Sequence, residues 1–196
     1  MPTPRKKPID RALLKGKAVY IRHPVKRDEA QWCALWEESW EHLKPWYPRP
    51  ASAHTGAAST RFGLLMKSYD TPTNQQHLVC RRSDDSIVGM VNLGQIFHGP
   101  FRSCYIGYWV GERFAGKGYT SAAVRLVLRR AFGELKLHRV EANVIPDNGP
   151  SIALAESVGF RREGYSPRYL KIAGKWQDHV RFAMTVEDWR EMRKRS

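Results

Sequence analysis

Residues 111–120 read GERFAGKGYT and combine three glycines with an arginine and a lysine. They follow the apolar stretch Tyr108-Trp109-Val110 and precede a segment whose apolar residues have helical spacing. At the start of a helix, free backbone N–H groups and the positive end of the helix dipole converge. Gly116 and Gly118 allow the backbone to adopt positive φ and to approach an anion closely. The segment therefore indicates a loop that binds the phosphate groups of a ligand.

Seven of the first eight residues also match the phosphate loop of nucleoside triphosphatases, G-x-x-x-x-G-K-[ST]. Gly118 stands where that motif needs a hydroxyl to bind magnesium. A triphosphatase also needs a carboxylate at the end of an apolar strand, whereas residues 139–145 lead into Pro146-Asp147. The sequence thus disfavours ATP hydrolysis and predicts a phosphate site without a metal. An accidental glycine-rich turn is the remaining alternative.

The elements that position this loop follow from apolar periodicity and turn residues. Strands are expected at 18–22, 77–82, 86–96, 103–110, 139–145, 161–172 and 176–184. Helices are expected from Asp28, as the N-cap, to about Glu41, at 59–69, from Thr120 to about Leu135, just before Gly159 and at the C-terminal end. This order predicts a single-domain α/β fold with a mixed, mostly antiparallel seven-stranded sheet flanked by helices. The domain would span residues 18–196, after a basic N-terminal tail at 1–17.

Three tryptophans stand out in the first expected helix. Trp32, Trp36 and Trp40 follow one another at four-residue spacing, which stacks their rings on one helix face. Packing in the core is the favoured interpretation, and lining a substrate cleft is the alternative.

Composition limits the class of protein. The chain has 196 residues, of which 42% are apolar, and a formal net charge of +14. This charge attracts anions, but no nucleic-acid-binding module or interleaved basic and aromatic face is found. Contact with a ribosome or another acidic partner stays open. The chain contains no apolar run long enough for a membrane helix, no signal-like start and only three scattered cysteines, so a cytoplasmic protein is expected.

A second spacing within the loop is [RQ]-x-x-G-x-[GA], read as Arg113-Phe-Ala-Gly116-Lys-Gly118. With it, the chain resembles the GNAT acetyltransferases, which bind the pyrophosphate of acetyl-CoA with this loop. YIGYWVGERFAGKGYTSAAV, HRVEANVIPDNGPSIALAESVGF and REGYSPRYLKIAGKWQDHV resemble the branch that acetylates the N-termini of ribosomal proteins. EHLKPWYPRP and HGPFRSCYIGY resemble its ribosomal-protein-alanine members. The resemblance covers nearly all of residues 18–190.

The resemblance implies a set of acetyl-CoA-binding residues. The backbone of Trp109 and Val110 would meet the pantetheine arm, with the Val110 amide polarising the thioester carbonyl. Asn148 and Ser151 match N-x-x-S and would bind the cofactor near its reactive end, although capping of the following helix is an alternative role. The pyrophosphate would be held by the loop and the start of the next helix, which comprise Arg113, Phe114, Ala115, Gly116, Lys117, Gly118, Tyr119 and Thr120.

Several residues are candidates for the catalytic groups. Glu141 shares one face of its strand with Asn143, and it is the first candidate for the general base, with an ion pair to an arginine as the equal alternative. Asp178 is expected to anchor a backbone group, with shaping of the acceptor site as the alternative. His138 and His179 are expected to be structural. Many relatives place a tyrosine in the helix after the fifth strand, where this chain has Leu154 and Ala155. The acid that protonates the leaving thiolate would then be Ser151, Tyr165 or water, or the thiolate would leave unassisted.

The expected function is an acetyl-CoA-dependent N-acetyltransferase that needs no metal and acts by direct acyl transfer. The leading acceptor is the N-terminal alanine amine of a ribosomal or other protein. The alternatives are a small amine, such as a polyamine, an amino acid or an antibiotic, and a binding module that holds acyl-CoA without turnover.

Overall fold

The computed structural model describes residues 11–47 and 58–194. Nine strands within these residues form one sheet. They are β1 (Leu14–Lys15), β2 (Val19–Arg22), β3 (Asp70–Thr71), β4 (Asn74–Arg81), β5 (Ile87–Phe97), β6 (Ser103–Val110), β7 (Arg139–Val144), β8 (Arg161–Ile172) and β9 (Lys175–Thr185). The helices are α1 (Glu29–Glu38), α2 (Trp40–Leu43), α3 (Ala58–Ser68), α4 (Tyr119–Gly133), α5 (Gly149–Val158) and α6 (Val186–Lys194).

The strand order is β1-β2-β4-β5-β6-β7-β9-β8, and β3 pairs with β4 outside this path. Each neighbouring pair is antiparallel except β6 and β7, which confirms the mixed, mostly antiparallel sheet. The seven expected strands are present, but the number seven was too low. β1 and β3 are two residues long and add to the edge of the sheet. β1 lies inside the segment 1–17 that the sequence suggested as a tail.

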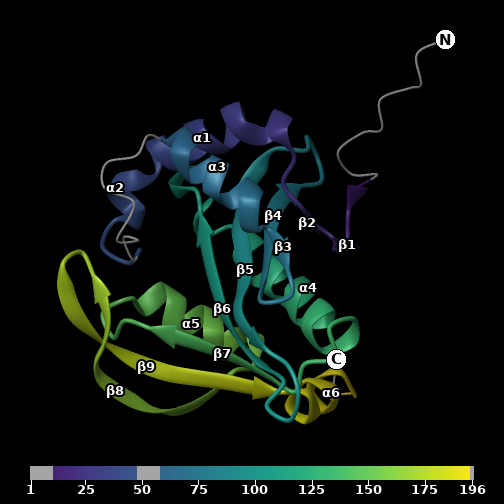
Figure 1. Cartoon of the computed structure of the whole chain (residues 1–196), viewed down its shortest axis with the longest axis vertical. Helices are drawn as coiled ribbons and strands as arrows, with labels where there is room; N and C mark the ends of the chain where they lie inside the picture. The colour runs from purple at the N-terminus through teal and green to yellow at the C-terminus, as the bar shows by residue number, and fades with distance from the viewer. Residues whose placement is uncertain (1–10, 48–57, 195–196) are drawn as a thin grey trace.

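β6 and β7, the parallel pair of strands, are paired only at one end. β6 and β7 are paired at Ser103 with Arg139, at Cys104 with Val140 and at Tyr105 with Glu141. Beyond these three pairs β6 runs on beside β5, while β7 continues with β9 alone. The two strands therefore spread apart toward the end of β6 (Figure 1). The loop at 111–118 begins on the open side of this divergence.

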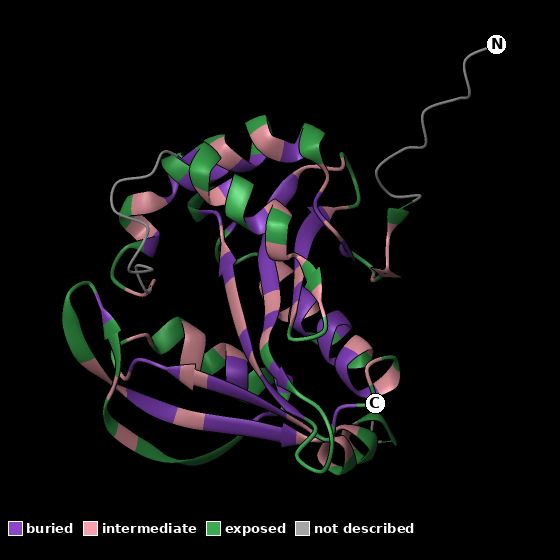
Figure 2. Cartoon of the chain, viewed as in Figure 1, coloured by how far each residue is buried: buried purple, intermediate pink, exposed green. Residues whose placement is uncertain are grey.

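Helices cover both faces of the sheet. α4 packs against β2, β4, β5 and β6, and the apolar residues of its inner face, Val124, Val127, Leu128 and Ala131, are fully buried. α5 contacts β7, whereas α1 contacts β5 and α3 contacts β4. Successive residues of a strand point to opposite faces, and on β6 Trp109 reaches α1 while Tyr108 reaches α5. α1 and α5 thus lie on opposite faces, and the buried positions concentrate on the strands between the two helical layers (Figure 2).

The start and the end of the first helix differ from expectation. Asp28 makes no side-chain cap to α1. Instead its carboxylate accepts two hydrogen bonds from the Arg22 guanidinium, at 2.6 and 2.8 Å, and one from the N–H of Val25 at 2.8 Å. Arg22 is 2% exposed, and burying its charge requires this partner. The helix also ends at Glu38, and Ser39 separates it from α2.

The caps of α5 match the sequence. The Asn148 side chain accepts a hydrogen bond from the N–H of Ser151, Pro150 occupies the first turn, and Gly159 ends the helix with a φ of 102°. A left-handed residue of this kind is most easily supplied by glycine. None of the described helices is long and apolar enough to cross a membrane.

Candidate active site

The glycine-rich loop joins β6 to α4. A short 3-10 helix at Glu112–Phe114 comes first, and then Gly116 and Gly118 adopt left-handed conformations with φ of 71° and 74°. A Cβ added to either glycine would meet no atom within 4 Å, so open space adjoins both residues. The segment from Ala115 to Gly118 is exposed. The two expected positive φ angles are therefore present, and they lie immediately before the first residue of α4.

This geometry suits an anionic ligand. The first N–H groups of α4, which begins at Tyr119, have no partners within the helix, and the helix dipole adds positive potential at the same place. Lys117 and Arg113 bring two positive charges. The Lys117 ammonium donates to the Arg113 carbonyl at 2.8 Å, so this lysine also folds back and closes the loop.

Arg113 and Phe114 have structural contacts of their own. The Arg113 guanidinium lies 3.0 Å from the Glu38 carboxylate at the end of α1 and 4.8 Å from the centre of the Phe114 ring. Phe114 is 5% exposed and packs into the core, so only its backbone can reach a ligand. Thr120 and Tyr119 are partly exposed in the first helical turn.

The end of β6 presents backbone groups to the open side of the sheet. The N–H of Gly111 donates to the carbonyl of Val88 on β5 at 2.9 Å. Backbone groups alternate in direction along a strand. The N–H and C=O of Trp109 therefore also point to β5, whereas the N–H and C=O of Tyr108 and Val110 point to the side from which β7 has diverged. The N–H and C=O of Val110 are therefore available to a ligand that lies between the diverging strands.

The N-terminus of α5 lies beside the same strand. Asn148 Oδ1 accepts from the Ser151 N–H at 3.2 Å, which is the capping arrangement. The Ser151 hydroxyl lies 2.9 Å from the Tyr108 hydroxyl, and the phenol also lies 3.3 Å from the Ser151 carbonyl, to which it donates. Burial raises the pKa of Tyr108, against the opposing effect of Ser151, so the phenol keeps its proton at neutral pH.

Sequence reasoning missed Tyr108. α5 carries no phenol, since Leu154 and Ala155 stand there, and the phenol beside Ser151 comes from β6 instead. Tyr108 alternates with Trp109 and Gly107 along β6, which directs its side chain to the face that α5 covers. Strand alternation was thus a usable signal, although the partner on α5 is 43 residues away in the chain.

Glu141 lies among arginines. Its Oε1 accepts from Arg139 Nε at 3.1 Å and its Oε2 from Arg181 at 2.6 Å. Arg181 also donates to Asn143 Oδ1 at 2.5 Å and stacks on the Tyr169 ring, 4.7 Å from its centre. The ion pair that the sequence offered as an alternative is therefore present. Glu141 is 8% exposed, and it shares its strand face with Asn143 as expected.

The other titratable candidates have structural partners. Asp178 accepts from the Arg168 N–H at 2.7 Å and from the Tyr165 hydroxyl at 2.6 Å, so it anchors a backbone group. The Tyr165 hydroxyl is thereby engaged away from Ser151. His138 lies 3.2 Å from the Glu187 carboxylate. Burial lowers the pKa of His179, whose ring contacts the carbonyl of Gln177.

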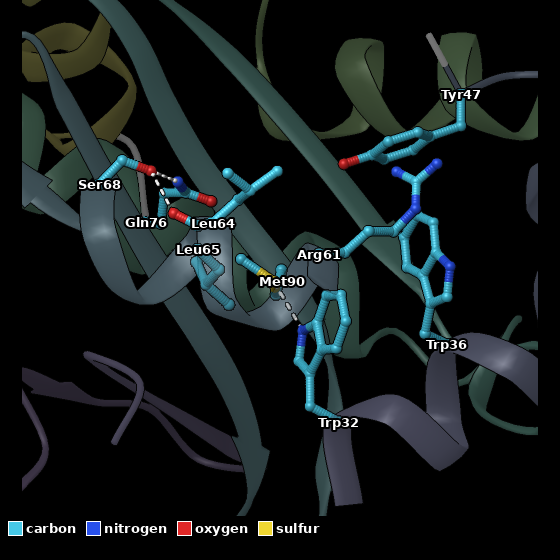
Figure 3. Close-up of a pocket in the computed structure, with 9 residues that line it drawn as sticks. All are labelled: Trp32, Trp36, Tyr47, Arg61, Leu64, Leu65, Ser68, Gln76 and Met90. Carbon is cyan, nitrogen blue, oxygen red and sulfur yellow. Dashed lines mark hydrogen bonds between the residues drawn. The ribbon is translucent and has the colours of Figure 1, made fainter. Parts of the chain in front are cut away.

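The tryptophans form both core and pocket wall. Trp32 and Trp36 stack with ring centres 5.4 Å apart and planes 6° from parallel, and Trp40 continues the series 5.7 Å from Trp36. Trp36 also meets the edge of Trp109 at 5.3 Å. Trp32 and Trp36 are each 4% exposed, yet both line a pocket of about 220 Å³ between α1, α3 and β5 (Figure 3). Core packing of the tryptophans is therefore confirmed, and the lining of a substrate cleft stays a prediction that this pocket allows.

Among the described residues, no group of three or more His, Cys, Asp and Glu side chains could hold a metal ion. The residues expected to bind acetyl-CoA divide into two sets. One set is the exposed loop and the first turn of α4. The other comprises Trp109 and Val110 at the end of β6 and Asn148 and Ser151 at the start of α5, with Tyr108 between them.

Comparison with known proteins identifies the family. The model of the acetyltransferase (GNAT) domain matches residues 19–161. The [ribosomal protein uS5]-alanine N-acetyltransferase of Escherichia coli is 31% identical over 183 residues, which cover 92% of this chain and 94% of that protein. The structure of Mycobacterium smegmatis RimJ in complex with CoA-disulfide is similar with a TM-score of 0.79 and 34% identity, over 87% of this chain and 83% of that one.

A spermidine N-acetyltransferase from Vibrio cholerae in complex with CoA and spermine shares the fold, with a TM-score of 0.74 and 19% identity over 89% of this chain and 99% of that one. The chain belongs to the GNAT acetyltransferases. It is an N-acetyltransferase, and its co-substrate is acetyl-CoA.

Proposed function

We propose that this GNAT acetyltransferase transfers the acetyl group of acetyl-CoA directly to the N-terminal amine of a protein, with a ribosomal protein that begins with alanine as the leading acceptor. The observation that carries the acceptor is the 31% identity to a ribosomal-protein-alanine N-acetyltransferase over nearly the full length of both chains. The fold alone does not discriminate acceptors.

The proposed cofactor site uses the exposed loop and the divergence of β6 and β7. The amides around Gly116 and Gly118, together with the start of α4, would hold the pyrophosphate, and open space at both glycines supports this fit. The N–H of Val110 would donate to the thioester carbonyl, on which negative charge develops during attack. One such donor contributes about 3–4 kcal/mol to transition-state stabilisation in well-studied enzymes.

The acceptor amine must lose a proton, because the ammonium ion has no free electron pair. An N-terminal amine has a pKa near 8, so a weak base, acting directly or through water, suffices. Glu141 stays the candidate for this base. Each of its oxygens accepts one bond from a guanidinium, which leaves further lone pairs for a water molecule.

The departing thiolate must gain a proton. We propose that Ser151 supplies it and recovers a proton from Tyr108, whose hydroxyl lies 2.9 Å away and turns from the Ser151 carbonyl to the Ser151 hydroxyl in this step. Burial keeps the phenol protonated. In the complete step the N–C bond forms, the C–S bond breaks, the amine proton passes to the base, and the proton of the Tyr108–Ser151 pair passes to sulfur.

A small amine is the second acceptor class, because the fold that this chain shares with a spermidine N-acetyltransferase also accommodates such acceptors. The net charge of +14 works against a polycation such as spermidine, because like charges raise the free energy of the encounter complex. A free amino acid carries a carboxylate that compensates its ammonium group, so the positive net charge of the protein repels it less.

The test has two stages. Acetyl-CoA should raise the melting temperature, and desulfo-CoA, which keeps the pyrophosphate, should do so too. Acetyl transfer is then measured with peptides that begin with Ala, Ser or Met and with spermidine and free amino acids. Turnover of the Ala peptide above the others supports the proposal. No thermal shift would contradict the cofactor site, and a shift without turnover on any of these amines would contradict both proposed acceptor classes.

A further inference from the structure

The pocket between α1, α3 and β5 contains a single charged side chain among the described residues that line it. This residue is Arg61, on α3. The rest of the lining is aromatic, aliphatic or neutral and polar, and includes Trp36, Tyr47, Gln76 and Met90. Figure 3 shows the Arg61 guanidinium reaching past Trp36 toward the Tyr47 ring. The pocket is thus an apolar site with one cation in its wall.

Aromatic rings hold this guanidinium in place. Its carbon lies 5.0 Å from the centre of the Trp36 ring, 5.7 Å from Trp40 and 5.9 Å from Tyr47. Rings stabilise a guanidinium through its flat face, so its N–H edge stays available for a carboxylate. Within residues 11–47 and 58–194, Arg61 forms no ion pair, whereas Arg22 pairs with Asp28 and Arg113 with Glu38.

Tyr47 adds a second donor at the same wall. Burial raises the pKa of its hydroxyl, and the lowering effect of Arg61 is smaller, so the phenol keeps its proton. Gln76 and Ser68 are bonded to each other at 3.2 Å on the opposite wall. A ligand that enters between these walls meets N–H and O–H donors on one side and the Met90 side chain at the floor.

The pocket lies next to the proposed reaction centre. Met90 on β5 is the cross-strand partner of Trp109 on β6, and such partners have Cβ atoms about 5 Å apart. Val110, the proposed donor to the thioester, is the next residue. An extended peptide advances about 3.3 Å per residue. If the terminal amine of the acceptor attacks beside Val110, the group that reaches the pocket therefore belongs to one of its first few residues.

We propose that the pocket binds a carboxylate of the acceptor, through the Arg61 guanidinium and the Tyr47 hydroxyl, and that the enzyme selects acceptors with an acidic group close to the reacting amine. This inference rests on the proposed function for its position beside Val110. The acidic group is either an Asp or Glu side chain in the first few residues of a protein or the carboxylate of a free amino acid.

The test compares charge at fixed size. Peptides that begin with alanine carry Glu, Gln or Lys at the second or third position, and kcat/KM is measured for each. Hydrogen bonds to charged groups give about 10-fold to 100-fold discrimination, so the Glu peptide should exceed the Gln peptide by about 10-fold or more at one of these positions. Free alanine, alaninamide and spermidine form the small-molecule arm, because the amide replaces the α-carboxylate at nearly the same size.

Variants assign the preference to the pocket. Arg61→Gln should reduce the Glu-to-Gln ratio to about one, and Arg61→Lys should retain only part of it because the bidentate fork is lost. Arg129→Gln is the matched control, since Arg129 is exposed on α4 and its loss changes net charge by the same amount. The control should keep the full ratio. Melting temperatures with acetyl-CoA show that each variant is folded.

The outcomes separate the two proposals. Equal kcat/KM for the Glu and Gln peptides and for alanine and alaninamide in the wild-type enzyme, or a preference that survives in Arg61→Gln, overturns the carboxylate pocket and leaves the N-terminal acetyltransferase untouched. An Arg61-dependent preference confined to free amino acids supports the pocket and overturns the protein acceptor. Acetyl-CoA binding without transfer to any of these amines overturns both.

Discussion

Replacing Gly118 by alanine adds one methyl group where α4 begins. Gly118 has a φ of 74°, a left-handed conformation that costs an L-residue about 1–2 kcal/mol. Its Cβ would meet no atom within 4 Å, so backbone strain is the entire native-state effect. Alanine also lowers the conformational entropy of the unfolded chain, which raises the free energy of unfolding by about 0.4–1 kcal/mol. Gly118→Ala should therefore lower the free energy of unfolding by about 1 kcal/mol.

Gly133 offers a matched control at the other end of the same helix. A Cβ there also meets no atom within 4 Å, and the residue is helical. Alanine is the better helix former, so Gly133→Ala should raise the free energy of unfolding by about 0.5 kcal/mol. The same chemical change thus has opposite signs at the two ends of α4. Urea unfolding should separate the variants by about 1.5 kcal/mol, and melting temperatures by about 4 °C.

The cofactor affinity completes this experiment. If the loop amides hold the pyrophosphate, a shift of the backbone that relieves the strain at Gly118 moves them from their positions. The dissociation constant of acetyl-CoA, measured by calorimetry, should then rise about 5-fold, the equivalent of about 1 kcal/mol, and stay unchanged in Gly133→Ala. Stability effects of the same sign, or equal acetyl-CoA affinity in both variants, would refute the reasoning.

Three further predictions concern titration and proton transfer. Burial lowers the pKa of His77 to about 3, so His77 stays neutral in the folded protein, whereas it titrates near pH 6.5 in the unfolded chain. The contribution of this difference to the free energy of unfolding is complete above pH 6.5 and falls by about 2 kcal/mol at pH 5. Urea unfolding of His77→Gln should show that much less acid sensitivity, and an acid sensitivity equal to that of the wild type would contradict this assignment. Tyr108→Phe should lower kcat about 100-fold with KM little changed, if the phenol replenishes the proton of Ser151; a change in melting temperature alone would indicate a structural role. Glu141→Gln should lower kcat/KM more at pH 7 than at pH 9, where the amine loses its own proton; a deficit equal at both pH values would contradict a base and favour the ion-pair role.

The sequence predicted the larger elements well because each is long enough to show a period. The apolar residues of α4 recur at helical spacing, and the C-cap glycine of α5 has the left-handed φ of 102° that its position suggested. The strands β1 and β3 were missed since two residues show no alternation. Their pairing depends on the neighbouring strand, which local sequence does not specify.

Long-range partners account for most of the remaining differences. Asp28 resembles a helix cap in every local respect, but buried Arg22 takes its carboxylate. Ser39 interrupts an otherwise helical run, and its hydroxyl accepts from the N–H of Glu112, 73 residues later, at 3.0 Å. No pattern within α1 signals that contact.

The candidate site also combines features that local sequence predicts with contacts that distant residues make. The glycine spacing predicted the positive φ values, and the two-residue period predicted the face of Glu141. The guanidinium that holds Glu141 comes from Arg181 on β9, 40 residues away. Which of several arginines occupies that place depends on the register of β7 with β9, and register is a property of the folded sheet.

The divergence of β6 from β7 also determines how amide protons exchange with solvent along a single strand. The N–H groups of Trp109 and Gly111 point to β5 and are held there, whereas those of Tyr108 and Val110 point to the side that β7 has vacated. Slow and fast exchange should therefore alternate residue by residue at the end of β6. A ligand that slows exchange at Val110 would occupy the position of a missing strand, so that its own carbonyl completes the hydrogen bonds of the sheet.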